Sequence, residues 1–458
     1  GYGMESHIIN GNNILDVYTK VSNIAEDIRK NPRPVLLEFK TFRMRGHEEA
    51  SGTKYVPKEL METWAKKDPL KNYETFLRSK NILTEQQITN ATKEIKAEIN
   101  EHLQMAFNEE TISADLETEL KDVFKGYQQE IIAPSNKKTS IRLIDAISKG
   151  LRESMERYDN LVIMGQDVAE YGGVFKITEG FTEQFGRERV RNTPICESAI
   201  VAAAYGAALN GMKAVMEMQF ADFVSSGFNP IVNLLAKSNY RWNQNADVVV
   251  RMPCGAGVGA GPFHSQTNEA WFTKTPGLKV VYPAFPEDAK GLLCAAINDP
   301  NPVLFFEHKA LYRSIYQEVS DDYFTVELGK ASLLKEGNDV TIISYGAGVH
   351  WALDTLKTHP EISADLLDLR TLQPLDVATI YESVRKTGKA IFLQEDSLFG
   401  SIASDVAALI TEHCFESLDA PVKRVASIET PIPFQGELEK QYLPKHRFAT
   451  ELKTLLEY

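Results

Sequence analysis

Short apolar runs that alternate with helical segments restrict the fold of this chain more than any other feature. From residue 161 onward, five such runs are predicted as buried strands, and the stretches between them favour helices. The runs are Leu161–Met164, Ala214–Met218, Val248–Met252, Lys279–Tyr282 and Val303–Phe306. Strands that alternate with helices predict a largely parallel sheet covered on both faces. The sequence therefore predicts an α/β domain over residues 137–325.

A second α/β domain is expected over residues 326–458, because the same alternation continues there. Its predicted strands are Val340–Tyr345, Ser363–Leu369, Ala390–Gln394 and Val422–Ser427. The stretch at residues 58–136 differs, since it is rich in charge and helix formers and ends in a cluster of turn formers. We expect two to four surface helices and a linker there.

The first 57 residues contain half of an α/β unit. Apolar residues recur at helical spacing from Ile14 to Ile28, and Val35–Phe39 follows as a buried strand. One helix and one strand do not make a complete layer. We therefore expect the partners of this segment to precede residue 1.

Composition narrows the classes of function. A net charge of −13 argues against nucleic acid and anionic membranes as main partners, because both select basic patches. The four cysteines are far apart and form no CxxC pair, which favours a reducing compartment over a structural zinc site. No leader pattern and no apolar stretch of about 18 residues is present. These features predict a cytoplasmic protein that does not span a membrane.

Three motifs carry the candidate chemistry. They are N-T-P-I-C-E at Asn192–Glu197, Q-F-A-D-F at Gln219–Phe223 and F-H-S-Q at Phe263–Gln266. Glu197 enters an apolar helix, and a carboxylate is costly to bury unless a neighbour accepts its proton or donates a hydrogen bond. Taken alone, Glu197 is also explained as an acidic residue at a helix N-terminus, stabilised by the helix dipole. A lone histidine is likewise more often structural than catalytic.

Residues 137–458 resemble the β subunit of the decarboxylating component of branched-chain 2-oxo acid dehydrogenases. The three motifs carry the resemblance, together with longer matches at residues 165–176, 276–281, 305–313, 368–376 and 429–434. Residues 1–130 resemble the C-terminal part of the α subunit, on N-G-N-N at residues 10–13, R-M-R-G-H at residues 43–47 and T-K-Y-V-P at residues 53–57. The resemblance implies a transketolase-like, thiamine-diphosphate-dependent fold.

Four segments follow from this resemblance. Residues 1–57 correspond to the end of a diphosphate-binding α-type domain, and residues 58–136 to its helical tail and linker. Residues 137–325 correspond to the pyrimidine-binding domain, and residues 326–458 to the transketolase C-terminal-like domain. The chain therefore resembles an α-subunit tail fused to a complete β subunit.

The resemblance also implies roles for individual residues. Glu197 corresponds to the glutamate that activates the cofactor through its pyrimidine ring, and Phe223 to the aromatic ring that stacks on the pyrimidine. Gln219 corresponds to a position that faces the substrate pocket. His264 corresponds to a histidine that serves the substrate carboxylate or the incoming lipoyl group, and His47 to an α-subunit histidine near the phosphates and the reacting carbon.

The activity implied is oxidative decarboxylation of branched-chain 2-oxo acids, with acyl transfer to a lipoyl-bearing acyltransferase of a multienzyme complex. A dimer, or a heterotetramer with a separate α part, is the implied assembly. Three alternatives stay open at this point: a pyruvate-type dehydrogenase, a transketolase-like ketol transferase, and a non-catalytic assembly module. The first two are enzymes of the same cofactor class.

Metal sites are only partly represented in the sequence. The family's Gly-Asp-Gly…Asn motif for Mg²⁺ and diphosphate does not occur, so those ligands are expected upstream of residue 1. A structural monovalent cation such as K⁺ would fall near Asp299 and Asn301, although this run is equally an ordinary turn. Two departures concern accessory groups: Gln166 replaces a second glutamate, and Gln394-Glu395 replaces a His-Glu pair.

Overall fold

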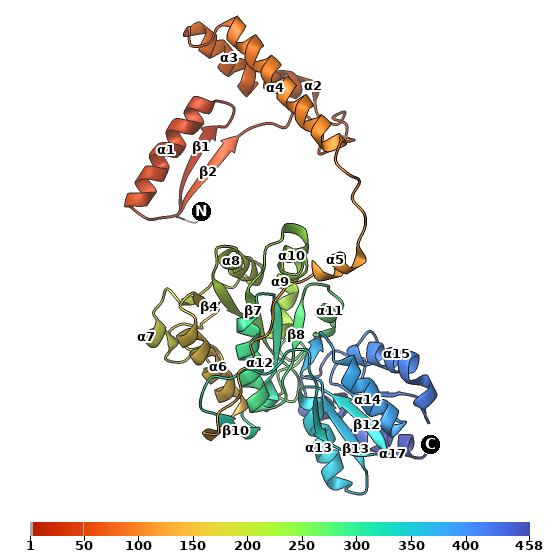
Figure 1. Ribbon diagram of the computed structural model, residues 1–458. Coiled ribbons are helices and arrows are strands. Elements are labelled where there is room, and N and C mark those ends of the chain that lie inside the picture. Colours follow the sequence, from red (N-terminus) through yellow and green to blue (C-terminus); the bar gives the residue numbers. More distant parts are fainter. Residues whose placement is uncertain (1–2, 49) are drawn as a thin grey trace. The chain divides into compact units, whose positions relative to one another are not determined.

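The computed structural model describes residues 3–48 and 50–458, and its internal contacts separate two units, residues 1–114 and 115–458. Each unit is described by itself (Figure 1). Every predicted strand is present, with ends displaced by at most two residues. None of the helices in the described ranges has both the length and the apolarity needed to cross a bilayer.

The smaller unit begins with a β-α-β segment. Strand β1 (Glu5–Asn10) and strand β2 (Val35–Lys40) pair in parallel, and helix α1 (Ile14–Lys30) connects them. The Asn13 side chain caps α1 by accepting the backbone N–H groups of Leu15 and Asp16. A partner for β2 therefore lies within the chain, which corrects the expectation that all its partners precede residue 1. Strand β1 escaped prediction because E-S-H-I-I-N has only two adjacent apolar residues.

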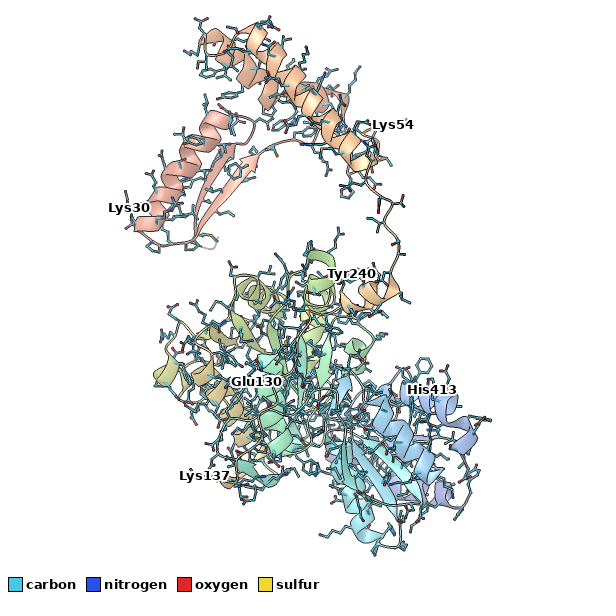
Figure 2. All side chains as sticks on the ribbon, viewed as in Figure 1. Lys30, Lys54, Glu130, Lys137, Tyr240 and His413 are labelled. Atoms are coloured by element: carbon cyan, nitrogen blue, oxygen red, sulfur yellow. The ribbon has the colours of Figure 1, made fainter. Side chains whose placement is uncertain are left out.

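Three helices complete the smaller unit and a fourth begins the larger one. They are α2 (Lys58–Ala65), α3 (Pro69–Ser79), α4 (Glu85–Phe107) and, in the larger unit, α5 (Leu116–Lys121). The first residues of the larger unit pack along the surface of that same unit. The labelled side chains of Figure 2 mark two of its anchors: the Tyr240 hydroxyl donates to Glu119 at 2.7 Å, and the Arg157 guanidinium donates to Glu130 at 2.9 Å.

A seven-stranded sheet forms the centre of the larger unit, in the order β14-β8-β9-β7-β6-β4-β5. All neighbouring strands are parallel except the edge strand β14. The strands are β4 (Leu161–Gly165), β5 (Val190–Asn192), β6 (Lys213–Glu217), β7 (Val248–Cys254), β8 (Lys279–Val281), β9 (Val303–His308) and β14 (Thr371–Gln373). A separate two-stranded sheet pairs β3 (Lys138–Arg142) with β10 (Tyr316–Ser320).

Helices cover both faces of this sheet, as the sequence predicts. Alternate strand residues belong to different clusters: Leu161 and Ile163 pack with α6 (Leu143–Arg157) and α12 (Pro286–Asn298), whereas Val162 and Met164 pack with α8 (Glu197–Leu209). The remaining helices are α7 (Phe181–Phe185), α9 (Val224–Pro230), α10 (Ser238–Trp242), α11 (Ala270–Thr273), and the short helices η1 (Ala221–Phe223), η2 (Ile231–Leu235) and η3 (Lys309–Leu311).

The C-terminal domain is a second α/β lobe, blue in Figure 1. Its five-stranded sheet has the order β11-β13-β12-β15-β16. The strands are β11 (Ser332–Lys335), β12 (Val340–Ser344), β13 (Ala364–Asp368), β15 (Ala390–Leu393) and β16 (Lys423–Val425). The helices are α13 (Ala347–Thr358), α14 (Val377–Thr387), α15 (Ile402–Cys414), η4 (Phe415–Ser417), α16 (Gly436–Tyr442) and α17 (Lys445–Leu456). Because β14 joins the sheet of the preceding domain, the two lobes share hydrogen bonds.

Candidate active site

Glu197 lies where the sequence predicts a buried carboxylate. It is the first residue of α8, its side chain is 9% exposed, and Gln166 Nε2 donates to its Oε1 at 3.2 Å. Gln166 directly follows β4, the strand next to β5 in the parallel sheet. The carboxyl ends of parallel strands meet at one edge, where open α/β sheets bind their ligands. Burial, an amide donor and the helix dipole therefore act together on Glu197.

An aromatic cluster surrounds His264. Phe220 and Phe223 come directly after β6, and His264 belongs to the loop after β7. The His264 ring lies 4.9 Å from the Phe220 ring and 5.6 Å from the Phe223 ring between centroids, edge-to-face in both cases. Such edge-to-face contacts are attractive and directional. The structure thus brings together Phe223 and His264, two of the predicted site residues.

Gln219 connects this cluster with the end of β4. Its side chain is half-buried, and Nε2 approaches Asp167 Oδ2 at 3.5 Å. Asp167 adjoins Gln166, the residue that holds Glu197. Four of the predicted residues therefore lie along one edge of the sheet, after strands β5, β6 and β7: Glu197, Gln219, Phe223 and His264.

Asp222, which the sequence analysis did not single out, holds the His264 loop. Its Oδ1 accepts the backbone N–H groups of Ser265 and Gln266, both at 3.1 Å. Oδ2 is buried and has no hydrogen-bond partner among the described residues. Burial raises the pKa of Asp222, and the two backbone donors lower it. The available signal was a single acid between two aromatic residues in Q-F-A-D-F.

A buried ionic network connects the neighbouring strands β6, β7 and β9. Arg251 is fully buried; its Nε and Nη2 donate to both carboxylate oxygens of Glu307 at 2.7 and 2.8 Å, and its Nη1 donates to Glu217 at 2.7 Å. The Tyr312 hydroxyl donates to Glu307 at 2.7 Å. Burial raises the pKa of Glu217, and Arg251 opposes that rise. Charges inside apolar strand runs were the signal for this network.

One aromatic side chain connects this network to the aromatic cluster. The Phe175 ring lies 5.1 Å from the Tyr312 ring and 5.7 Å from the Phe220 ring, edge-to-face in both cases. The Arg251 network therefore lies close to the residues that surround His264, and its charges form part of their electrostatic environment.

A pocket of about 750 Å³ opens beside the His264 loop, between the two domains of the larger unit. Its lining includes Phe263 and Gln266 from the loop, Trp271, and Asp396, Phe399 and Tyr442 from the C-terminal domain. Burial raises the pKa of Asp396 to about 6.

His47 belongs to the smaller unit. It is exposed in the loop between β2 and α2, and Arg43 Nη2 donates to its backbone carbonyl at 2.5 Å. Nothing in this local structure tests a catalytic role, so the role of His47 stays a prediction.

Asp299 and Asn301 already have protein partners. The Asp299 carboxylate is contacted by the Lys279 ammonium, and its Oδ1 accepts the backbone and side-chain N–H groups of Asn301 at 2.9 Å. The Asn301 side chain in turn pairs with the backbone of Lys125. A cation at this place stays a prediction, and it would compete with the Lys279 ammonium. Within residues 3–48 and 50–458, no group of three or more His, Cys, Asp or Glu side chains is arranged to hold a metal ion.

Three family models match successive parts of the chain. The "Dehydrogenase E1 component" matches residues 1–114, the "Transketolase, pyrimidine binding domain" matches residues 139–314, and the "Transketolase, C-terminal domain" matches residues 329–447. The candidate residues Glu197, Gln219, Phe223 and His264 all fall within the second match.

Known proteins resemble the chain over about two thirds of its length. It is 48% identical over 305 residues to the 2-oxoisovalerate dehydrogenase subunit beta of Bacillus subtilis (strain 168), covering 66% of this chain and 93% of that protein. It is 43% identical over 318 residues to the pyruvate dehydrogenase E1 component subunit beta of the same organism, covering 68% and 96%. A solved split gene transketolase, described as an inactive beta4 tetramer, shares the fold with a TM-score of 0.57 and 24% identity, covering 69% of this chain and 98% of that one.

Proposed function

Because the chain belongs to the family of 2-oxo acid dehydrogenase E1 components, as a β subunit preceded by an α-like segment, we propose that it decarboxylates a branched-chain 2-oxo acid oxidatively with thiamine diphosphate. The acyl group passes to the lipoyl group of an acyltransferase in a multienzyme complex. The observation that carries this proposal is the buried Glu197 carboxylate, held by Gln166 at the sheet edge that also carries the aromatic cluster.

The described residues fit the pyrimidine end of the cofactor. Glu197 offers a buried carboxylate that can share a proton with a pyrimidine ring nitrogen, and Phe223 offers an aromatic face. When bound, thiamine diphosphate supplies a nucleophilic carbon and accepts the electron pair that loss of CO₂ leaves behind. The described residues contain no metal-binding cluster, so we propose that the Mg²⁺ and diphosphate ligands lie outside them.

Each site residue then has a defined task. The Glu197 carboxyl group holds a proton at the pyrimidine ring nitrogen, and Gln166 keeps it oriented by donating to Oε1. His264, when protonated, offers positive charge to the substrate carboxylate, and its ring orientation is set by Phe220 and Phe223. Gln219 contacts the substrate. His47 serves the phosphates and the reacting carbon.

The substrate class is supported by similarity alone. Identity is higher to the 2-oxoisovalerate dehydrogenase subunit than to the pyruvate dehydrogenase subunit, 48% against 43%. That margin keeps pyruvate as a second candidate, because one methylene in an apolar pocket changes specificity by only about 1–3 kcal/mol. Rates of CO₂ release from 3-methyl-2-oxobutanoate and from pyruvate decide between them. Carbon transfer between sugar phosphates would instead indicate a ketol transferase.

The proposed assembly and location follow the family. The parts are an α-type remnant at residues 1–57, a helical tail and linker at 58–136, a pyrimidine domain at 137–325 and a C-terminal domain at 326–458. We propose a cytoplasmic protein that self-associates as a dimer, or as a heterotetramer with a separate α part. A K⁺ ion at Asp299 and Asn301 would have to displace the Lys279 ammonium from the Asp299 carboxylate.

Replacement of Glu197 by Gln tests the assignment. The amide keeps the shape but cannot exchange the proton, so CO₂ release should fall by roughly 10²–10⁴-fold. Turnover is measured with 3-methyl-2-oxobutanoate, thiamine diphosphate, Mg²⁺ and an artificial electron acceptor. Glu188→Gln is the matched control, since that carboxylate is 90% exposed and pairs only with Arg191 among the described residues.

Two results would contradict the proposal. Unchanged turnover in Glu197→Gln would remove the assigned role from that residue. An inactive wild-type chain that gives no heat on calorimetric titration with thiamine diphosphate and Mg²⁺ would favour the non-catalytic assembly module.

A further inference from the structure

The loop that carries His264 has an unusual backbone. Between β7 and His264 it contains Gly255, Gly257, Gly259 and Gly261, and all four have positive φ angles between 69° and 88°. Glycine adopts this region at no steric cost, but a loop rich in such residues gains little rigidity from its own side chains. Backbone N–H groups in turns of this kind form concave anion sites. The position of His264 therefore depends on what fills and holds this loop.

A carboxylate from the C-terminal domain fills the concave side. Glu439, in α16, accepts the N–H of Gly257 at 2.9 Å and the N–H of Gly259 at 3.1 Å and 3.3 Å, one distance for each carboxylate oxygen. The Glu439 residue is only 5% exposed. Hydrogen bonds from backbone amides to a buried carboxylate are among the stronger ones in proteins.

A second carboxylate from the same domain holds the start of the loop. Glu395 follows β15, is 5% exposed, and accepts the N–H of Ala256 through Oε1 at 2.6 Å. Its Oε2 lies 2.6 Å from His308 Nε2, while His308 Nδ1 accepts the N–H of Ala310, so His308 donates through Nε2. The Lys309 ammonium donates to the Gly255 carbonyl at 2.8 Å.

Close packing adds a third contact. A Cβ atom at Gly261 would lie 2.6 Å from the ring of Phe434, another residue of the C-terminal domain. On the far side of His264, the pyrimidine domain holds Ser265 and Gln266 through Asp222. His264 therefore lies between two anchors, one from each domain.

We propose that the C-terminal domain positions His264 by gripping the glycine-rich loop through Glu439 and Glu395. Both are positioning residues, because they act on His264 through their hydrogen bonds to the loop. The inference rests on the proposed function of His264 and extends it: a shift of one domain against the other moves His264 relative to Glu197. The C-terminal domain thereby controls the reactivity of a site built on the preceding sheet.

Loop motion gives the first test, and it does not depend on activity. In the full chain, Glu439→Ala should speed amide hydrogen exchange at residues 256–264 at least tenfold, as measured by mass spectrometry. Glu437→Ala is the control, because Glu437 lies on the same helix and pairs with Lys440 at the surface. If Glu439→Ala does not fold, the isosteric Glu439→Gln replaces it. Exchange that matches wild type would overturn the proposal.

A double-mutant cycle gives the second test. Glu439→Ala should lower kcat/KM for the 2-oxo acid at least fivefold in the wild-type background and leave it unchanged in a His264→Ala background. Losses that multiply would mean that Glu439 acts independently of His264, and the proposal would fail. An inactive wild-type chain with a protected loop would contradict the proposed function, but not the inference that the C-terminal domain holds the loop.

Discussion

Among single residues, Arg251 is a charge buried inside the apolar core of the larger unit. Arg251 is fully buried between Glu217 and Glu307. Burial alone would lower the pKa of Arg251, but the two carboxylates raise it, so the guanidinium stays charged. A buried charge that loses its partner costs several kcal/mol, whereas an exposed pair contributes little. The network therefore rigidifies the sheet edge next to the site only while it is complete.

Arg251→Met tests this dependence. The substitution leaves Glu307 and Glu217 side by side without a cation, so the free energy of unfolding should fall by about 3–5 kcal/mol. Arg187→Met removes an exposed pair with Glu170 and should cost less than about 1 kcal/mol. Urea denaturation measures both. Similar losses in the two variants would show that the buried network contributes no more to the free energy of unfolding than an exposed ion pair.

At the scale of elements, the glycine-rich loop and the strand ends set the geometry of the site. Gly255 has a φ of 88°, and a Cβ there would lie 2.3 Å from His308 Nε2. Gly259 has a φ of 70° with nothing within 4 Å of the same position. The two glycines therefore share a backbone strain and differ in the space around them.

Gly255→Ala and Gly259→Ala separate these two effects. Backbone strain alone should cost Gly259→Ala about 1–2 kcal/mol. Gly255→Ala should cost at least about 1 kcal/mol more, because the His308–Glu395 contact has to shift. Thermal and urea unfolding of the two variants give the difference. Equal losses would mean that the His308 ring moves aside without a cost in free energy.

At the scale of the whole larger unit, the interface between its two domains holds carboxylates in an unusual state. Burial, reinforced by the nearby Asp396 charge, raises the pKa of Glu269 to about 8, and the Tyr345 hydroxyl donates to its Oε1 at 2.7 Å. Burial, reinforced by the negative charge of Glu395, also raises the pKa of Asp396 to about 6. Near neutral pH, Glu269 therefore carries its proton in the folded protein.

This raised pKa predicts a pH-dependent stability. An acid whose pKa is higher when folded binds more protons in the folded state, so the free energy of unfolding falls as pH rises from about 4.5 to about 8. Glu269→Gln cannot ionise, and its stability relative to wild type should increase across that window. Glu429→Gln, at an exposed position of the pocket that Asp396 lines, should leave the pH dependence of stability unchanged. A stability difference independent of pH would contradict the assignment.

Local sequence patterns predicted much of the fold and of the candidate site. Short apolar runs predicted the central strands of both α/β domains, with ends displaced by at most two residues, because strands covered on both faces are buried throughout. Motif resemblance selected Glu197, Gln219, Phe223 and His264, which the fold brings to one sheet edge. These features depend on neighbours close in sequence or on a topology that parallel sheets impose.

Only the tertiary structure decided the pairings between distant residues. The short edge strands β1, β5 and β14 are ladder partners without an apolar signature of their own. Lys279 contacts the Asp299 carboxylate, Arg251 joins Glu217 to Glu307, and Glu439 reaches a glycine loop about 180 residues earlier. Such contacts arise because a buried charge or amide must find a partner wherever the packed chain places one. No local pattern in the sequence predicts these pairings.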